Sequence, residues 1–142
     1  MPVDKKTLNQ YRALQREIPK LKKDIQKLND KLDKVPDVAG KVMKSSDEFP
    51  YIVEHVKVDI KDPRPADEIK KQIRYKELRL DRAERQKTEI EMFIAGIEDS
   101  MDRQIFEMLY TNDEKMSQAA VGDIVGYTQG RISQIINSYL KD

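Results

Sequence analysis

The stretch SQAAVGDIVGYTQGRISQIINSYL (residues 117–140) contains two short apolar segments separated by a Gly-Tyr pair. Ser117 and Thr128 are good N-cap residues, because a side-chain oxygen at that position accepts a hydrogen bond from a backbone N–H of the first helical turn. The sequence therefore predicts one helix over residues 118–125 and a second helix from residue 129 to about residue 140.

The glycine spacing in this stretch is typical of a helix-turn-helix. That motif needs a small residue where its two helices cross, a glycine four residues later for a left-handed turn, and branched apolar residues six and nine positions after that glycine. These positions are occupied by Gly122, Gly126, Ile132 and Ile135. A generic helical hairpin would need no small residue at position 122, where an interior glycine costs about 1 kcal/mol of helix stability. A helix-turn-helix that binds double-stranded DNA is therefore the favoured interpretation.

The outward face of the second predicted helix carries side chains suited to base edges in the major groove. Arg can bind guanine bidentately, Gln and Asn can bind adenine in the same way, and Ser or Thr hydroxyls bind a base or a phosphate. The expected DNA-binding residues are Ser117, Gln118, Thr128, Gln129, Gly130, Arg131, Ser133, Gln134 and Asn137. For all of these except Arg131 and Gln134, a solvated polar position is an equally good interpretation.

The C-terminal sequence resembles region four of bacterial sigma factors, the helix-turn-helix that reads the −35 promoter element. The resemblance is carried by SMDRQIFEMLY (residues 100–110) and MSQAAVGDIVGYTQGRISQIINSYL (residues 116–140). It implies that Arg131 and Gln134 stand where that family carries an arginine and a glutamine in its recognition helix.

The arrangement of the whole chain is similar to a family of small phage-encoded transcription regulators of Gram-positive hosts, related to the ArpU and RinA late-gene activators. The segments that carry this resemblance are LNQYRALQREIPKLKKDIQKL (8–28), VMKSSDEFPYIVEHVKV (42–58) and IEMFIAGIEDSMDRQIFEMLY (90–110). It implies DNA binding near promoters and admits contact with RNA polymerase. Sigma regions that open DNA or bind the −10 element are missing, so the resemblance implies a regulator and not a complete sigma factor.

Two apolar stripes at heptad spacing precede this module. The first comprises Tyr11, Leu14, Ile18, Leu21, Ile25, Leu28, Leu32 and Val35; the second, interrupted by Lys76 and Lys87, comprises Ile69, Ile73, Leu80, Ala83, Ile90, Ile94, Ile97 and Met101. They predict a mainly α fold in which a coiled-coil stalk, a long antiparallel helical hairpin over residues 1–100, precedes a helix-turn-helix domain over residues 101–142. Pairing within one chain and pairing between two chains both remain open. Pro19 predicts a kink or a restart of the first helix.

A period of two replaces the helical period between the two stripes. Val56, Val58 and Ile60 alternate with Lys57 and Asp59, which predicts a strand paired with residues 41–44. We therefore expect a small β-hairpin at about residues 38–62 that packs on the stalk or on a partner, because a lone hairpin is marginal in water.

The composition argues against several other classes of protein. The chain has no cysteine and one histidine, which disfavours a disulfide framework and a metal site. Its carboxylates alternate with Lys and Arg on helix faces, and no phosphate-cradling glycine loop or paired nucleophile and base is recognisable, so we expect neither an enzyme nor a cofactor. No apolar run approaches the roughly 20 residues of a membrane span, and the first ten residues lack a secretory signal, which predicts a cytoplasmic protein.

The charge is distributed unevenly along the chain. Between residues 5 and 34, ten Lys or Arg face four Asp or Glu, whereas residues 101–142 carry four Lys or Arg and six Asp or Glu. Because phosphate neutralisation supplies much of the affinity for DNA, we expect a homodimer that presents two recognition helices about 34 Å apart. The basic segment is either a source of phosphate contacts or, more simply, a solvated flank of the stalk. A small-terminase-like phage DNA-packaging protein and a coiled-coil adaptor that binds RNA polymerase stay as alternative functions.

Overall fold

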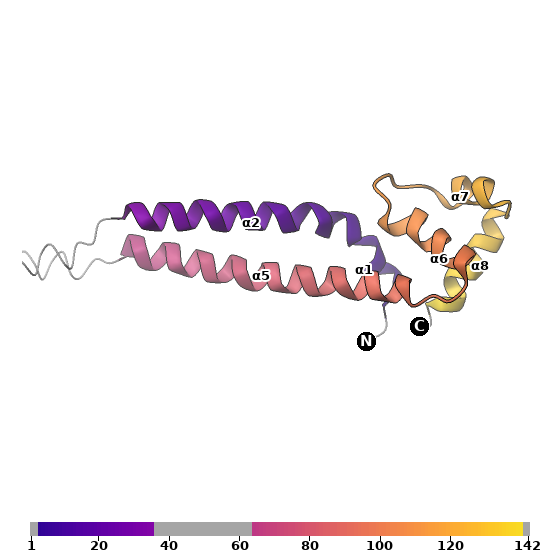
Figure 1. Ribbon diagram of the computed structural model, residues 1–142, viewed down its shortest axis with the longest axis horizontal. Helices are drawn as coiled ribbons and strands as arrows, with labels where there is room; N and C mark the ends of the chain where they lie inside the picture. The colour runs from indigo at the N-terminus through magenta and orange to yellow at the C-terminus, as the bar shows by residue number, and fades with distance from the viewer. Residues whose placement is uncertain (1–2, 36–63, 141–142) are drawn as a thin grey trace, which may run out of the picture. The chain divides into compact units, whose positions relative to one another are not determined.

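The computed structural model describes residues 3–35 and 64–140 of the chain, and these residues are mainly helical (Figure 1). The elements are α1 (Lys5–Asn9), α2 (Tyr11–Lys34), α5 (Arg64–Ala95), α6 (Ser100–Phe106), the π-helix η1 (Glu107–Thr111), α7 (Gln118–Val125) and α8 (Gln129–Tyr139). This confirms the predicted mainly α fold. The β-hairpin predicted at about residues 38–62 lies outside the described residues. None of the described helices combines the length and the apolar character that a membrane crossing requires.

The chain divides into two structural units. The first, called the terminal unit below, consists of Met1–Pro19 and Asp81–Asp142, and the second, called the middle unit, is Lys20–Leu80. Helices α2 and α5 each contribute to both units. The domain boundary expected near residue 100 stays a prediction.

Helix α2 lies beside α5 of the same chain, and the two run in opposite directions (Figure 1). In the terminal unit, the Tyr11 hydroxyl donates a hydrogen bond to Glu91 Oε2 at 2.6 Å. In the middle unit, Lys76 Nζ lies 3.2 Å from Asp24 Oδ2. In each unit, a residue of α2 thus contacts a residue of α5 of the same chain.

The two predicted apolar stripes form the faces that α2 and α5 bury. The fully or nearly fully buried members are Tyr11, Leu14, Ile18 and Leu21 on α2 and Ala83, Ile90 and Ile94 on α5. Lys76 interrupts the second stripe, and its partly exposed ammonium group forms an ion pair with Asp24. Met101 departs from the expected stripe, because it belongs to α6 and 38% of its surface is exposed.

Pro19 does not restart the first helix. Helix α2 is continuous from Tyr11 to Lys34 with Pro19 inside it, so of the two expected alternatives the restart is wrong and the kink stays a prediction. A proline in a helix interior removes one backbone hydrogen bond. The apolar side chains on either side of it, Ile18 and Leu21, are both buried, and we infer that their burial compensates for the lost bond.

An aromatic cluster forms the centre of the terminal unit. The fully buried ring of Phe106 lies with its centroid 5.9 Å from Phe93, 5.9 Å from Tyr110 and 5.6 Å from Tyr139. The contacts with Phe93 and Tyr139 are edge-to-face and that with Tyr110 is tilted, and such ring contacts add to the stabilisation that burial of the rings provides. Because the four rings come from α5, α6, η1 and α8, one cluster joins the long helix to the C-terminal helices.

Arg12 binds the loop that precedes α7. Its guanidinium group donates to three backbone carbonyl oxygens, those of Asn112 at 2.9 Å, Leu109 at 3.1 Å and Glu114 at 3.2 Å. The π-helix η1 ends in this loop and leaves carbonyl groups without helical partners. A side chain from the first turn of α2 therefore supplies the missing donors from a position about a hundred residues away in the sequence.

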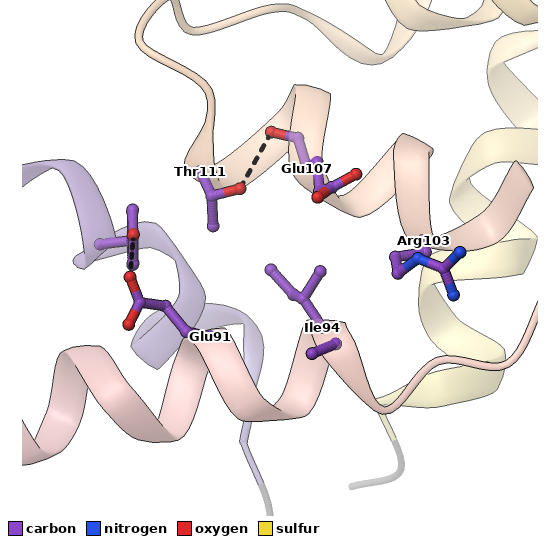
Figure 2. Close-up of a pocket in the computed structure, with 7 residues that line it drawn as sticks. Glu91, Ile94, Arg103, Glu107 and Thr111 are labelled. Carbon is purple, nitrogen blue, oxygen red and sulfur yellow. Dashed lines mark hydrogen bonds between the residues drawn. The ribbon is translucent and has the colours of Figure 1, made fainter. Parts of the chain in front are cut away.

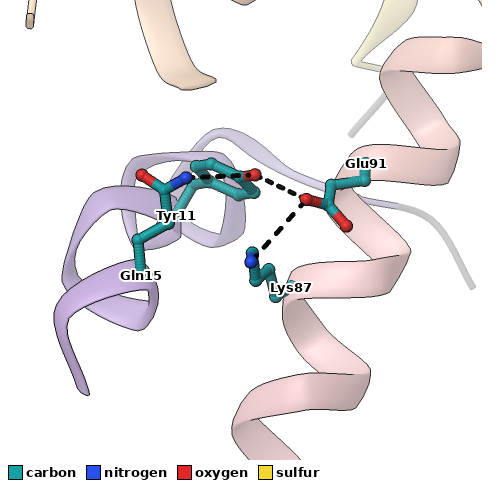
Figure 3. A network of polar contacts seen from close by, with 4 residues as sticks. All are labelled: Tyr11, Gln15, Lys87 and Glu91. Atoms are coloured by element: carbon teal, nitrogen blue, oxygen red, sulfur yellow. Dashed lines mark hydrogen bonds and ion pairs between the residues drawn. The ribbon is translucent and has the colours of Figure 1, made fainter. Parts of the chain in front are cut away.

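A short polar network lies where α2 meets α5 in the terminal unit (Figure 3). The Tyr11 hydroxyl donates to Glu91, accepts a hydrogen bond from Gln15 Nε2 at 3.5 Å, and Lys87 Nζ lies 4.0 Å from the same Glu91 oxygen. Burial of the phenol, together with its hydrogen bond to a carboxylate, raises the pKa of Tyr11 from 10.0 to about 12.

We expect this network to make stability depend on pH above pH 10. Because the folded state raises the pKa of Tyr11 from 10.0 to about 12, its contribution is fully present below pH 10 and is lost as the pH rises towards 12. Urea unfolding of the wild type and of Tyr11→Phe should therefore show a difference in unfolding free energy that is constant below pH 10 and changes above it, in the direction that disfavours the wild type. A difference that stays constant up to pH 12 would contradict the assignment.

Candidate nucleic-acid interface

The predicted N-caps of the two C-terminal helices are both present. Ser117 Oγ accepts a hydrogen bond from the backbone N–H of Ala120 at 3.1 Å and begins α7. Thr128 Oγ1 accepts from the backbone N–H of Arg131 at 3.1 Å and begins α8. The two helices therefore begin at the residues that the capping pattern indicated.

A left-handed glycine ends α7 and begins the turn. Gly126 has φ 81° and ψ 27°, the left-handed conformation that side chains with a Cβ atom disfavour. The backbone N–H groups of Gly126 and Tyr127 both donate to the carbonyl oxygen of Gly122, at 2.8 and 2.9 Å. These bonds satisfy the end of α7 and direct the chain into α8 within a few residues.

Gly122 is needed because the turn passes directly over α7. A Cβ atom at this position would collide with the carbonyl oxygen of Tyr127, closer than real Cβ atoms approach any atom. The atom it would meet belongs to the backbone, so a rotamer change cannot relieve the clash. The turn between α7 and α8 therefore requires a residue without a side chain at position 122, as the sequence indicated.

Three fully buried apolar side chains hold α7 against α8. These are Val121 on α7 and Ile132 and Ile136 on α8. Ile136 takes the place expected for Ile135, which is only half-buried. The physical reason is the helical period, because residues four apart lie about 40° apart around a helix, so Ile132 and Ile136 share one face more closely than Ile132 and Ile135 do.

The burial of Ile132 and Ile136 turns the opposite face of α8 to solvent. Of the nine predicted DNA-binding residues, the exposed ones are Ser117, Thr128, Gln129, Gly130, Arg131, Gln134 and Asn137, and the half-buried ones are Gln118 and Ser133. Figure 1 shows α8, in yellow, following α7 around the corner. Ser138 is also exposed and lies seven residues after Arg131, on the same face by helical period. The sequence interpretation missed it.

Tyr127 holds the Arg131 side chain at the start of α8. The guanidinium carbon of Arg131 lies 4.9 Å from the centroid of the Tyr127 ring, within the range of a cation–π contact. Sequence analysis did not identify Tyr127 as part of the site, although an aromatic residue in the turn four positions before the arginine was a usable signal. The contact limits the freedom of the one cationic side chain on α8.

The acidic residues of the C-terminal region do not lie on α8. Residues 129–139 contain no Asp or Glu. Asp99 is the N-cap of α6, and Asp102 accepts a hydrogen bond of 2.5 Å from the Tyr139 hydroxyl. That bond raises the pKa of Tyr139 to about 12. The excess of carboxylates in residues 101–142 therefore lies outside α8.

A pocket in the terminal unit is lined by residues that already have partners within the fold (Figure 2). Thr111 Oγ1 donates to the carbonyl oxygen of Glu107 at 3.4 Å, and Arg103 Nη1 donates to that of Ile97 at 2.7 Å. Glu91 accepts the bond from Tyr11 described above. The first bond lies within η1, the second joins α6 to the loop after α5, and the third joins α2 to α5, so these three bonds have structural roles.

Comparison with known proteins gives one similarity, which covers the C-terminal helices. Residues 99–141 match the family model described as Sigma-70, region 4. No curated protein and no solved structure matched the chain. The C-terminal part of the protein is thus similar to the DNA-binding helix-turn-helix of sigma factors, and the match begins at the residue that caps α6.

Two glycine substitutions should have opposite effects on stability. Gly122→Ala should lower the free energy of unfolding by about 1 to 3 kcal/mol, because the clash with the Tyr127 carbonyl outweighs the better helix propensity of alanine. Gly130→Ala is the matched control, since a Cβ atom there meets nothing within 4 Å, and it should leave stability unchanged or raise it by up to about 1 kcal/mol. Urea denaturation followed by circular dichroism measures both. Equal effects of the two substitutions would show that the close approach does not exist.

Proposed function

We propose that the protein is a sequence-specific transcription regulator that acts at promoters by placing α8 in the major groove of DNA. The observation that carries the proposal is the exposed face of α8, in a module similar to sigma region four, with Arg131, Gln134 and Asn137 outward and Ile132 and Ile136 buried.

The side chains on this face have the hydrogen-bonding groups that base recognition needs. In helix-turn-helix proteins the N-terminal residues of the recognition helix contact base edges. Arg131 lies in the first turn of α8 and Gln134 in the next. An arginine recognises guanine through O6 and N7, and a glutamine recognises adenine through N6 and N7. We infer that these two residues supply base preference and that Thr128 and Gln129, at the start of the helix, contact phosphates.

The cation–π contact with Tyr127 prepares Arg131 for this role. A long side chain loses rotamer freedom when it binds. Because the Tyr127 ring already restricts the guanidinium group in the free protein, less of that freedom remains to be lost on DNA. The ring is also flat, so the guanidinium can slide toward a base edge without breaking a directional hydrogen bond.

Further parts of the proposal come from the resemblances noted in the sequence. They are a phage origin, a role in late-gene activation, contact with RNA polymerase and action in the cytoplasm of a bacterial host. A homodimer fits the proposal because only one cationic side chain lies on each α8, and two modules double the number of phosphate and base contacts.

Substitutions of Arg131 should separate base recognition from charge. After selection of a binding site from random DNA, Arg131→Ala should lose about 1 to 3 kcal/mol of binding free energy and relax the preference at one base pair. Arg131→Lys keeps the charge but not the bidentate geometry, so it should relax the same preference while its affinity for unrelated DNA stays near that of the wild type. Electrophoretic shifts and footprints measure both. An unchanged site preference in both variants would contradict the assignment of Arg131.

The oligomeric state should distinguish the regulator from a DNA-packaging protein. Packaging proteins of the small-terminase type assemble into rings of many subunits, whereas the proposed regulator should be a dimer. Light scattering of the full chain at two protein concentrations gives the mass directly. A ring of eight or more subunits would favour packaging and overturn the promoter role.

A further inference from the structure

A row of lysines runs along α2 within the middle unit. Its members are Lys20, Lys23, Lys27, Lys31 and Lys34, all of them exposed. At 3.6 residues per turn they occupy about 80° of the helix surface and extend over roughly 20 Å. We call this set the lysine row.

The centre of the lysine row is rotated by about 130° around the helix from the centre of the buried seam. Leu21 is buried, and Ile25, Leu28 and Leu32 are half-buried on the side that faces α5. Because these residues alternate with the lysines at helical spacing, the packing of α2 on α5 orients all five ammonium groups away from α5. The alignment is thus maintained by the fold of the hairpin and does not depend on the lysine side chains themselves.

The carboxylates of this part of α2 offset the charge of the lysine row only in part. Asp24 forms its ion pair with Lys76 on α5, and Asp30 accepts a hydrogen bond from Gln26 at 3.0 Å. Within the described residues, none of the five lysines of the row makes an ion pair. By contrast, the exposed face of α5 carries an internal pair, Arg85 with Asp81 at 3.1 Å. Asp30 keeps its charge in that hydrogen bond and lies three residues after Lys27 and four before Lys34, so the row presents an excess of positive charge that is offset only in part.

We propose that the lysine row binds the phosphate backbone of DNA without reading its sequence, and so supplies the electrostatic attraction that the C-terminal module lacks. Duplex DNA carries one phosphate per roughly 1.7 Å of its axis, so a row of about 20 Å faces enough phosphates for each lysine to find one. The lysine ammonium is a compact charge on a flexible stem, which suits contacts to phosphates whose positions vary.

Other partners fit the row less well. A second copy of the same surface would bring like charges together. A helix that lies on a membrane inserts an exposed apolar face, whereas the apolar face of α2 is already covered by α5. An acidic protein would satisfy the charge, but nothing apolar lies within the row to anchor it.

This proposal shares with the proposed function only the binding of DNA, because contacts of the lysine row with phosphates need no particular base sequence. Because the row and the helix-turn-helix belong to one chain, each raises the local concentration of DNA at the other. We therefore expect the row to increase affinity for the specific site and for unrelated DNA by a similar factor.

The test compares three full-length proteins: the wild type, the triple variant K23Q/K27Q/K31Q, and the charge-preserving control K23R/K27R/K31R. Gln and Arg have helix propensities close to that of Lys, and circular dichroism verifies that α2 stays folded. Affinities are measured by fluorescence anisotropy at four salt concentrations, on a duplex with the selected site and on an unrelated duplex of equal length.

We expect the Gln variant to lose at least about tenfold in affinity at low salt on both duplexes, with a salt slope reduced by about two to three, while the Arg variant keeps the wild-type slope. The ratio of the affinities for the two duplexes should be unchanged.

Salt slopes that are equal in all three proteins would overturn the proposal and leave the helix-turn-helix assignment intact. A lower slope in the Gln variant on unrelated DNA, with no specific site found for any protein, would support the lysine row and overturn the sequence-specific function instead. If the Gln variant lost binding to an acidic peptide while its salt slopes on DNA stayed unchanged, the proposal for the lysine row would also be overturned.

Discussion

The helix-turn-helix depends on the absence of a side chain at residue 122. The carbonyl group of Tyr127 occupies the space that a Cβ atom would need, and the N–H groups of Gly126 and Tyr127 return to the carbonyl oxygen of Gly122. This contact determines where α8 begins, and the burial of Ile132 and Ile136 then determines its rotation about its own axis. The outward direction of Arg131 and Gln134 is a consequence of these two constraints together.

The terminal unit is stabilised by residues that are distant in the sequence. The Phe106 ring contacts rings from α5, η1 and α8. The Arg12 guanidinium donates hydrogen bonds to carbonyl oxygens of η1 and of the loop before α7. Contacts of large sequence separation cost more chain entropy to form than local ones. The orientation of α8 therefore depends on packing far from its exposed side chains.

Sequence patterns predicted the features that depend on local chemistry. Ser117 and Thr128 cap their helices, and Gly126 turns the chain as its spacing indicated, because caps and left-handed turns are decided within a few residues. Most members of the apolar stripes are buried or half-buried for a similar reason, since helical period alone selects one face. Seven of the nine residues expected to bind DNA are exposed, and Ile136 is buried in the place expected for Ile135.

Features that depend on tertiary contacts were not predictable in this way. Nothing local marks Arg12 as the donor to a loop a hundred residues later, and nothing local shows that α2 continues through Pro19. The contact of Arg131 with Tyr127 also depends on how tightly the turn closes. Each of these was decided by burial or hydrogen bonding between segments whose separation a single sequence does not report.

The three hydrogen bonds from Arg12 affect how the C-terminal module can be studied. A fragment that starts at Asp99 contains all of α6, α7 and α8, yet it lacks both Arg12 and the completely buried Leu8. In such a fragment the three carbonyl groups would have to find water, and each lost hydrogen bond costs about 1 kcal/mol. Weak or absent DNA binding by the excised module would then report a loosened scaffold, and the recognition helix is best assayed with the N-terminal residues still attached.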